Sequence, residues 1–386
     1  MEINELASAI RDIYGNDRPL NLHEPQFSDR DCGLVMDALR STFVSSVGEY
    51  ITKFEQSLSK LVNGMSVTAV VNGTSALHTC LRLSGVRAGD LVLTQSLTFV
   101  ATCNAIRYCD ADPVFIDVDR ETASMCPIAL AEFLQDNARI SGGEVIHRDL
   151  GRRIRAVMPM HTFGHPAKIT EISDVCRNWG LMLIEDAAEG LGSKFNGIPV
   201  GSFGDFAAIS FNGNKIITTG GGGAVVSKQW SDGNRAKHIT TTAKVPHRYE
   251  FIHDEVGFNY RMPNLNAALG CAQLEKLDGY LYKKREIAQR YKNIAQSAGL
   301  EFFDEPLGAR SNFWLNAVVC KNVRDRELLL DGLEKHDIYA RPVWKPMHSL
   351  EMYKKCPTGP LPNTDALSDQ LLCLPSSPRS INDVGI

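Results

Sequence analysis

The sequence predicts an α/β fold built on one large, mainly parallel sheet, with a smaller α+β domain at the C-terminal end. Between residues 67 and 227, strand-like and helix-like segments alternate, which is the pattern of parallel strands joined by crossover helices. Several strand-like segments are continuous apolar runs, as strands covered on both faces require. After residue 260, a long helical stretch, a strand and a further helix indicate a second, smaller unit.

The elements of the large domain follow from these patterns. Residues 1–30 are mixed, and Pro19 and Pro25 break any long helix there, so we expect an arm that packs on the main body. Residues 137–154 are polar and contain glycines, which is typical of an insertion or a hairpin. Apolar spacing predicts helices at 29–40, 49–62, 74–84, 98–108, 127–136 and 169–179. We expect strands at 67–71, 91–94, 114–117, 155–159, 181–184, 206–210 and 223–226, the last two as neighbours.

The smaller unit is expected to begin near residues 255–265. We therefore assign residues 1–260 to the arm and the large domain, and residues 261–386 to the small C-terminal domain. Within the small domain we expect one helix over 264–298, a strand over 313–320, a helix over 324–336 and a proline-rich loop tail.

The composition excludes several classes of protein. The net charge of −4 shows no basic footprint for nucleic acid, and no apolar run approaches the ~20 residues that span a bilayer. The N-terminal residues lack a basic segment followed by an apolar one, so we expect no secretion signal. The 10 cysteines are scattered without a CxxC pair, which fits a reducing compartment. We therefore expect a cytoplasmic protein without nucleic-acid or membrane partners.

The first candidate site is an anion-binding turn at Gly73, Thr74 and Ser75. These residues follow a strand and begin a helix, where free backbone N–H groups and the helix dipole attract anions. The two hydroxyl groups add further donors. An ordinary helix cap explains the same residues without any ligand.

A carboxylate ends the apolar strand run at 181–184. Asp186 is placed at the carboxyl edge of the sheet, where open α/β folds bind ligands. A carboxylate there suits the ring nitrogen of pyridoxal phosphate (PLP), which an acid keeps protonated. The alternative is a cap for the turn that follows. Glu189, three residues on, either reaches the hydroxyl side of such a ring or lies on the surface.

A lysine completes a set of parts suited to PLP. Lys215 follows a short strand run and precedes four glycines, 220–223, which we interpret as backbone room beside a flat cofactor. Ser210 is placed to reach the same phosphate as the turn at Gly73. A Walker motif is excluded because the glycines follow the lysine and no GK[ST] is present, and the glycines do not form GxGxxG after a first strand.

Two further motifs lie between these parts. Phe99 begins a helix after a strand, where an aromatic ring either stacks on a pyridine ring or packs in the core. His161 and His165 have the i,i+4 spacing of a metal site, but Gly164 and Pro166 disfavour a helix and no HExxH is present. We therefore expect no metal, and a loop that faces the site.

Together these motifs resemble the nucleotide-sugar aminotransferases of the DegT/DnrJ/StrS type, which have the aspartate aminotransferase fold (PLP-dependent transferase fold type I). Any one motif is weak, but six in this order are specific, and the resemblance covers nearly the whole chain. The six segments are 72–77, 98–102, 112–117, 185–189, 210–215 and 257–262, and the resemblance runs from 43–48 with 54–55 to His348.

The resemblance implies a role for each residue. Lys215 would hold PLP as a Schiff base and move a proton, and Asp186 would pair with the ring nitrogen. Phe99 would stack on the ring. The implied phosphate ligands are Gly73, Thr74, Ser75 and Ser210, with Asn259 reaching in from a second subunit of a homodimer with shared active sites. The implied substrate-binding residues are Ser45, Ser46, His161, Trp344 and His348.

The resemblance also suggests a substrate. Glu189 stands where many members carry glutamine, which resembles the subgroup acting on 4-keto-6-deoxy sugars. Segments 45–48, 137–154 and 210–223 are most similar to the aminotransferases of the legionaminic acid pathway, which move an amino group from glutamate to UDP-2-acetamido-2,6-dideoxy-4-hexulose in the synthesis of surface glycans such as lipopolysaccharide. GDP-perosamine synthases are the next most similar. Two other hypotheses are a PLP-binding regulator without turnover and a cysteine desulfurase-like lyase using Cys356.

Overall fold

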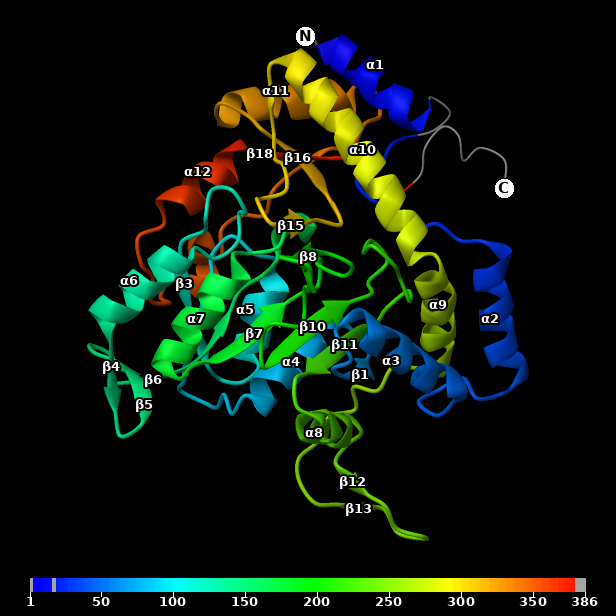
Figure 1. Ribbon diagram of the computed structural model, residues 1–386, viewed down its shortest axis with the longest axis vertical. Coiled ribbons are helices and arrows are strands. Elements are labelled where there is room, and N and C mark those ends of the chain that lie inside the picture. Colours follow the sequence, from blue (N-terminus) through cyan, green and yellow to red (C-terminus); the bar gives the residue numbers. More distant parts are fainter. Residues whose placement is uncertain (1–2, 16–18, 379–386) are drawn as a thin grey trace.

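The large sheet is present in the computed structural model, which describes residues 3–15 and 19–378 (Figure 1). It has nine strands, and the spatial order of its main path is β1 (Ser66–Val70), β11 (Gly223–Ser227), β10 (Phe206–Ser210), β7 (Met182–Asp186), β6 (Arg153–Met158), β2 (Leu91–Gln95) and β3 (Asp112–Ile116). β11 runs antiparallel to β1 and β10, and the other neighbours on this path are parallel. The expectation of a mainly parallel sheet, with 206–210 beside 223–226, is therefore confirmed.

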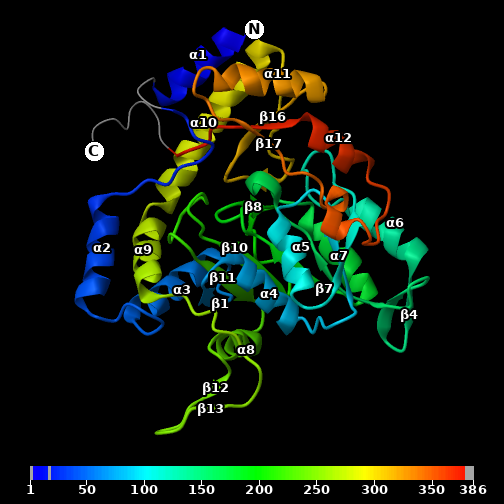
Figure 2. The ribbon, with the colours of Figure 1, turned by 180° about the vertical axis from the view of Figure 1, so that it is seen from behind.

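Helices cover both faces of this sheet, which explains the continuous apolar strands. In β10, Phe206 and Ala208 pack toward one face, whereas Ala207 and Ile209 pack toward the other. One face carries α4 (Gly73–Leu83), α5 (Val100–Arg107) and α8 (Trp230–Thr240). The opposite face carries α3 (Glu49–Leu61), α6 (Pro127–Asn137), α7 (Ile169–Trp179) and α9 (Asn264–Glu275), and α2 (Asp29–Arg40) packs on α9 (Figures 1 and 2).

Two hairpins extend from the large sheet. The polar segment at 137–154 forms β4 (Ala138–Ser141) and β5 (Glu144–His147), and β5 pairs with β6. The second hairpin, β12 (Lys244–Val245) with β13 (Ile252–His253), stands away from the body in both views (Figures 1 and 2). It carries exposed apolar side chains, since Tyr249 is 74% and Phe251 is 80% exposed.

A second sheet lies beyond the carboxyl edge of the large one, at the top of Figure 1. Its order is β14 (Glu301–Phe302), β16 (Asn316–Val319), β18 (Leu371–Leu374) and β17 (Arg341–Pro342). Its core contains residues of α1 (Ile3–Tyr14), α10 (Leu277–Ala298) and α11 (Val323–Glu334). The remaining elements are α12 (Pro362–Gln370), the short strands β8 (Lys194–Phe195), β9 (Ile198–Pro199) and β15 (Ala309–Arg310), and the 3₁₀ turns η1 (Thr162–Gly164), η2 (Met347–Ser349) and η3 (Glu351–Tyr353).

Three local expectations are corrected. The segment 264–298 is two helices, α9 and α10, which meet at Lys276, whose backbone N–H donates to the carbonyl of Gln273 at 3.1 Å. The N-terminal arm contains α1, whose buried face packs with the second sheet. The proline-rich tail contains α12 and β18, because Pro362 sits in the first turn of α12, where proline is tolerated.

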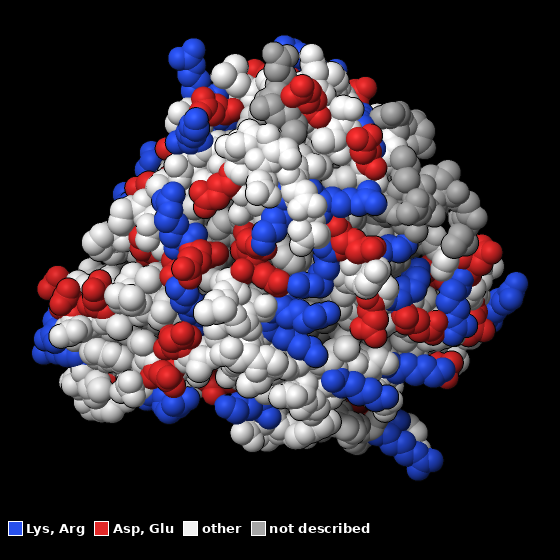
Figure 3. Space-filling view, turned by 45° about the horizontal axis from the view of Figure 1, so that its top comes forward, with Lys and Arg blue, Asp and Glu red and all other residues white. Residues whose placement is uncertain are grey.

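The surface agrees with the charge balance of the sequence. On the face shown in Figure 3, acidic and basic side chains are interspersed over the whole surface. Among the described residues, no helix combines the length and the apolar character that a bilayer crossing requires.

Candidate active site

The predicted parts converge on a cavity of about 410 Å³ at the carboxyl edge of the large sheet. β7 and β10 end at this cavity, and the first turns of α4 and α5 form part of its wall. Two tryptophans, Trp314 and Trp344, come to it from the C-terminal part of the chain. The lining residues are Asn72, Gly73, Thr74, Leu77, Phe99, Ala101, Met160, Asp186, Ala188, Glu189, Ser210, Asn212, Asn214, Lys215, Trp314 and Trp344.

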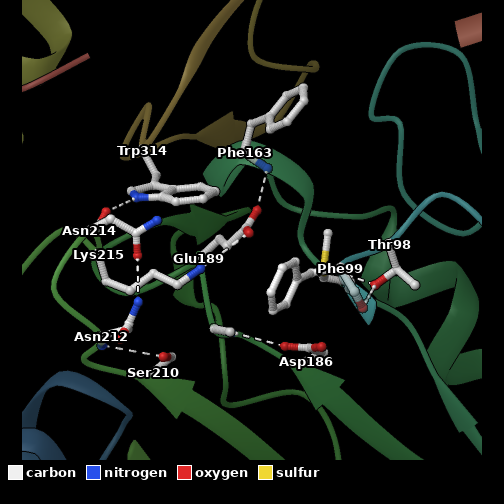
Figure 4. A network of polar contacts seen from close by, with 12 residues as sticks. Thr98, Phe99, Phe163, Asp186, Glu189, Ser210, Asn212, Asn214, Lys215 and Trp314 are labelled. Carbon is white, nitrogen blue, oxygen red and sulfur yellow. Dashed lines mark hydrogen bonds and ion pairs between the residues drawn. The ribbon is translucent and has the colours of Figure 1, made fainter. Parts of the chain in front are cut away.

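Lys215 lies in the turn between β10 and β11, and its side chain is 11% exposed. Its Nζ lies 3.3 Å from Oε1 of Glu189 and 4.0 Å from the centroid of the Trp314 ring (Figure 4). A carboxylate and an aromatic face therefore both contact the amine, and each stabilises a cation at this position.

Glu189 is buried beneath the lysine, with 3% of its surface exposed. The backbone N–H of Phe163 donates to its Oε2 at 2.9 Å, so both carboxylate oxygens are engaged. Burial raises the pKa of Glu189 to about 7, and the nearby Lys215 opposes that rise. The surface alternative for Glu189 is therefore excluded, and the residue is placed to titrate near neutral pH.

The cofactor-free enzyme is expected to show this titration in its stability. The unfolded chain keeps a glutamate pKa near 4.5, so between that pH and about 7 the folded protein binds more protons than the unfolded chain. Its free energy of unfolding therefore falls as the pH rises through this window, by on the order of 3 kcal/mol from this residue. Glu189→Gln removes this contribution, whereas a glutamine at the exposed Glu171 does not. Urea unfolding between pH 4.5 and 8 measures both, and parallel curves for Glu189→Gln and wild type would contradict the assignment.

Asp186 is the last residue of β7 and is 2% exposed. Thr102 donates to its Oδ2 at 2.7 Å, and the backbone N–H of Ala188 donates to its Oδ1 at 3.2 Å. Burial raises the pKa of Asp186, and the Thr102 hydroxyl is the strongest of the opposing contacts. The bond from Ala188 is the one that a capping role requires. The cavity also gives this carboxylate an open side toward a ligand (Figure 4).

The anion-binding turn forms at the start of α4. Asn72 caps the helix by accepting the N–H of Ser75 at 2.7 Å, which leaves Gly73 and Thr74 at the cavity while Ser75 does not line it. A Cβ at Gly73 would lie 2.8 Å from the Cβ of Ser210, so only glycine lets these two segments approach. A helix start beside a serine hydroxyl fits a phosphate group.

The glycines after Lys215 have a different use from the one we predicted. None of the four at 220–223 lines the cavity. A Cβ at Gly223 would lie 2.5 Å from the backbone of Asn72, and one at Gly222 would lie 2.1 Å from the Thr219 hydroxyl. Gly223 therefore lets β11 pack against the backbone that begins the phosphate turn, and it acts on the site indirectly.

Of the predicted aromatic and substrate-binding residues, Phe99 and Trp344 reach the cavity. Their ring centroids lie 6.4 Å apart, with the rings tilted by 62°. His348 does not line the cavity, since its ring and backbone N–H contact the hydroxyl of Ser96.

His161 also stays outside the cavity. It is fully buried, with Nδ1 accepting the N–H of Ala167 at 3.0 Å and Nε2 3.1 Å from Glu185. Glu185 in turn accepts the backbone N–H groups of Gly201, Phe203 and Gly204. His161 therefore supports the turn before β10. The loop around it does face the site, through Met160 and the N–H of Phe163.

Three predicted residues lie outside the cavity formed by one copy of the chain. Ser45 and Ser46 are in the loop before α3, where Asn264 binds the carbonyl groups of Phe43 and Ser45. Asn259 is exposed at the base of the β12–β13 hairpin and receives a hydrogen bond from Arg261 at 3.4 Å.

The structure adds residues that the sequence did not reveal. Trp314, Asn212 and Asn214 line the cavity, and Thr102 holds Asp186. The two asparagines had a signal, because they stand beside Lys215 in the sequence. Thr102 stands in the segment 98–102 that carries the resemblance, but neither it nor Trp314 had a local signal for its partner, which is distant in sequence.

The lyase hypothesis lacks its nucleophile. Cys356 packs in a small apolar cluster with Cys103, Phe115 and Tyr353 and does not line the cavity. Burial raises the pKa of its thiol, which disfavours the reactive thiolate. All ten cysteines are free.

The chain matches the family model described as the DegT/DnrJ/EryC1/StrS aminotransferase family over residues 25–383. EpsN of Bacillus subtilis (strain 168), which carries the name of a pyridoxal phosphate-dependent aminotransferase, is 36% identical over 371 residues, covering 95% of this chain and 93% of EpsN. The GDP-perosamine synthase of Escherichia coli O157:H7 is 36% identical over 334 residues, covering 86% and 87%. The aminotransferase TlmJ from Streptoalloteichus hindustanus superposes with a TM-score of 0.85 at 26% identity, covering 95% and 96%.

The fold and the cavity define a PLP-dependent transferase of fold type I. The residues present fit the cofactor, because the cavity combines a helix start that approaches Ser210 through Gly73 with a lysine and a buried acid. The chain belongs to the DegT/DnrJ/EryC1/StrS aminotransferase family, and it is a PLP-dependent sugar aminotransferase. The regulator hypothesis is thereby set aside.

Proposed function

We propose that the enzyme moves an amino group from glutamate to C4 of a nucleotide-linked 4-keto-6-deoxy sugar. The observation that carries this proposal is the group formed by Lys215, Glu189 and Asp186 in one cavity. Named relatives that include GDP-perosamine synthases support a sugar linked to a nucleotide.

Each residue has a task in such a transfer. PLP, when bound, supplies an aldehyde and an electron sink. Lys215 would hold it covalently, Gly73, Thr74 and Ser210 would hold its phosphate, and Asp186 would keep a proton at its ring nitrogen. The Lys215 amine, once free, is the group placed to carry a proton to and from the substrate carbon, and positioned proton transfer contributes roughly 10²–10⁴ in rate.

The walls of the cavity suit a deoxygenated sugar. Phe99, Trp314 and Trp344 present three aromatic side chains to the space above the sheet. Aromatic surfaces bind apolar faces and exclude water. A hydroxyl group that is buried against such walls without a hydrogen-bond partner is unfavourable. A sugar whose C6 is a methyl group has one hydroxyl fewer to satisfy than a sugar that carries a hydroxyl at C6.

Two sugar nucleotides are the leading candidates. One is UDP-2-acetamido-2,6-dideoxy-4-hexulose, which the sequence comparison first suggested. The hairpin at 137–154 contributes no residue to the cavity, so its resemblance to one subgroup does not bear on substrate choice. The other candidate is the GDP-linked 4-keto-6-deoxy sugar of perosamine synthesis, favoured by the 36% and 33% identities to two GDP-perosamine synthases.

A substrate panel tests the proposal. The enzyme is incubated with ¹⁵N-glutamate and with UDP-, GDP- and dTDP-linked 4-keto-6-deoxy sugars, and mass spectrometry follows label into the sugar. We expect transfer to C4 of at least one sugar by the wild-type enzyme and none by Lys215→Ala. Transfer only to 3-keto sugars, or to none of the panel, would contradict the proposal.

We further propose that the enzyme is a homodimer with shared active sites. The single copy leaves the apolar side chains of the β12–β13 hairpin exposed, and Asn259 lies at the base of this hairpin. If Asn259 serves the partner's site, mixing Lys215→Ala with Asn259→Ala chains rebuilds one intact site per mixed dimer. We expect the mixture, after subunit exchange, to be more active than either variant alone. Purely additive activities would contradict the shared site.

A further inference from the structure

A second lysine, Lys284, is buried beside the active site and takes no part in the proposed reaction. It lies on α10, and none of its surface is exposed. Its Nζ donates to the backbone carbonyl of Trp314 at 2.7 Å and to that of Ser376. Among residues 3–15 and 19–378, no carboxylate forms an ion pair with it, which is rare for a lysine without contact to water.

The two acceptors match the needs of a neutral amine. A neutral lysine amine has two N–H groups, whereas the charged form has three donors to satisfy. Burial lowers the pKa of Lys284 well below its usual range, because desolvation penalises the charged form. Lys284 therefore donates two hydrogen bonds that link the backbone segments of Trp314 and Ser376.

One of these segments carries the aromatic side chain above Lys215. Trp314 is fixed at three further points: Asn312 accepts its backbone N–H at 2.8 Å, the carbonyl of Asn214 accepts its indole N–H at 2.6 Å, and its ring contacts Lys215. Asn312 also donates to the carbonyl of Glu189 at 2.8 Å. The segment of Asn312 and Trp314 therefore supplies the aromatic contact to the Lys215 amine and also binds the backbone of Glu189, the other group that contacts this amine.

We propose that Lys284 is a positioning residue for the active-site amine: by holding the Trp314 carbonyl, it keeps the indole face against Lys215. The inference rests on Lys215 as the cofactor lysine and goes beyond the substrate proposal. In this arrangement Lys284 joins α10 to the carbonyl groups of Trp314 and Ser376, and Trp314 alone carries the effect to the Lys215 amine.

The test measures the Lys215 amine in the cofactor-free protein. Competitive acetylation, followed by mass spectrometry of the Lys215 peptide, gives the pH midpoint of its reactivity. Lys284→Met removes both donors and keeps an unbranched side chain, so the Trp314 carbonyl loses its partner on α10 while the contacts to Asn312 and Asn214 remain. We expect the midpoint to fall by about 0.5–1 pH unit, the equivalent of one weakened cation–π contact. Trp314→Leu should lower it as well, and adding Lys284→Met to Trp314→Leu should change nothing further.

Two variants separate positioning from a general loss of stability. Tyr291→Phe is the matched control, because Tyr291 also lies buried on α10 and donates to the neighbouring carbonyl of Pro375 at 2.8 Å, without contacting Trp314. Lys284→Gln keeps two N–H donors on an uncharged group. We expect both to keep the wild-type midpoint. If Lys284→Met does not fold, Trp314→Leu, which leaves Lys284 in place, still tests the contact, and an unchanged midpoint in Trp314→Leu would then contradict the proposal.

The titratable groups around Lys215 are unchanged in all these variants. They are Glu189, Asp186 and His23, and His23 also faces Lys284. An unchanged or raised midpoint in Lys284→Met, an equal fall in Tyr291→Phe, or additive effects with Trp314→Leu would each overturn the proposal. Failure of the cofactor assignment has a different signature, namely covalent PLP on another residue while the midpoint still shifts.

Discussion

Lys215→Ala is expected to abolish covalent attachment of PLP and to reduce amine transfer by a factor on the order of 10⁴ or more. The amine is the only lysine that lines the described cavity, and an alanine provides neither the nucleophile nor the proton carrier. The purified variant should lose the yellow colour of the bound cofactor. Absorbance spectra and single-turnover assays with glutamate measure both effects.

Lys228→Ala is the control for this experiment. Lys228 follows β11 in the sequence and is exposed, so its loss should change neither colour nor rate. If Lys215→Ala remains yellow after dialysis and transfers amine at the wild-type rate, another residue holds the cofactor and the mechanism proposed here is wrong.

Asp186→Asn is expected to slow both half-reactions by roughly 10³, the typical cost of losing one preorganised electrostatic contact. Asparagine keeps the shape of the side chain but does not hold a proton on a ring nitrogen by charge. Covalent attachment at Lys215 should persist, so the variant stays yellow while its single-turnover rates fall. This pattern distinguishes Asp186 from Lys215.

Thr102→Val provides a graded comparison. It leaves the carboxylate in place and removes the donor 2.7 Å from its Oδ2. The loss of one hydrogen bond to a buried charge is worth ~1.5–3 kcal/mol, so rates should fall by about 10- to 100-fold. If Asp186→Asn transfers amine as fast as wild type, the role of Asp186 is lost, and Thr102 then has only a structural effect.

The elements that the sequence predicted well are those whose signals are local. The strands 206–210 and 223–226 are apolar runs bounded by polar residues, and the structure forms them at nearly the same positions. Asp186, Ser210 and Lys215 were found because strand ends place side chains at one edge of a parallel sheet. Gly73 was found because a strand that turns into a helix creates an anion site.

The features that the sequence missed depend on contacts between distant segments. Trp314 reaches Lys215 across the boundary between the two sheets, and no periodicity in its own segment indicates this. The resemblance implied a substrate-binding role for His161, but its contacts with Glu185 and Ala167 hold it in the interior. The break between α9 and α10 is one residue long, and neither a glycine nor a proline marks it in the sequence.

Borohydride reduction of the purified holoenzyme, followed by peptide mapping, tests the central claim most directly. Reduction converts a Schiff base into a stable secondary amine, so the modified peptide identifies the cofactor lysine. We expect loss of the visible absorbance and a single modified site at Lys215. A phosphopyridoxyl group on any other lysine, or a reduced protein that carries none, would contradict it.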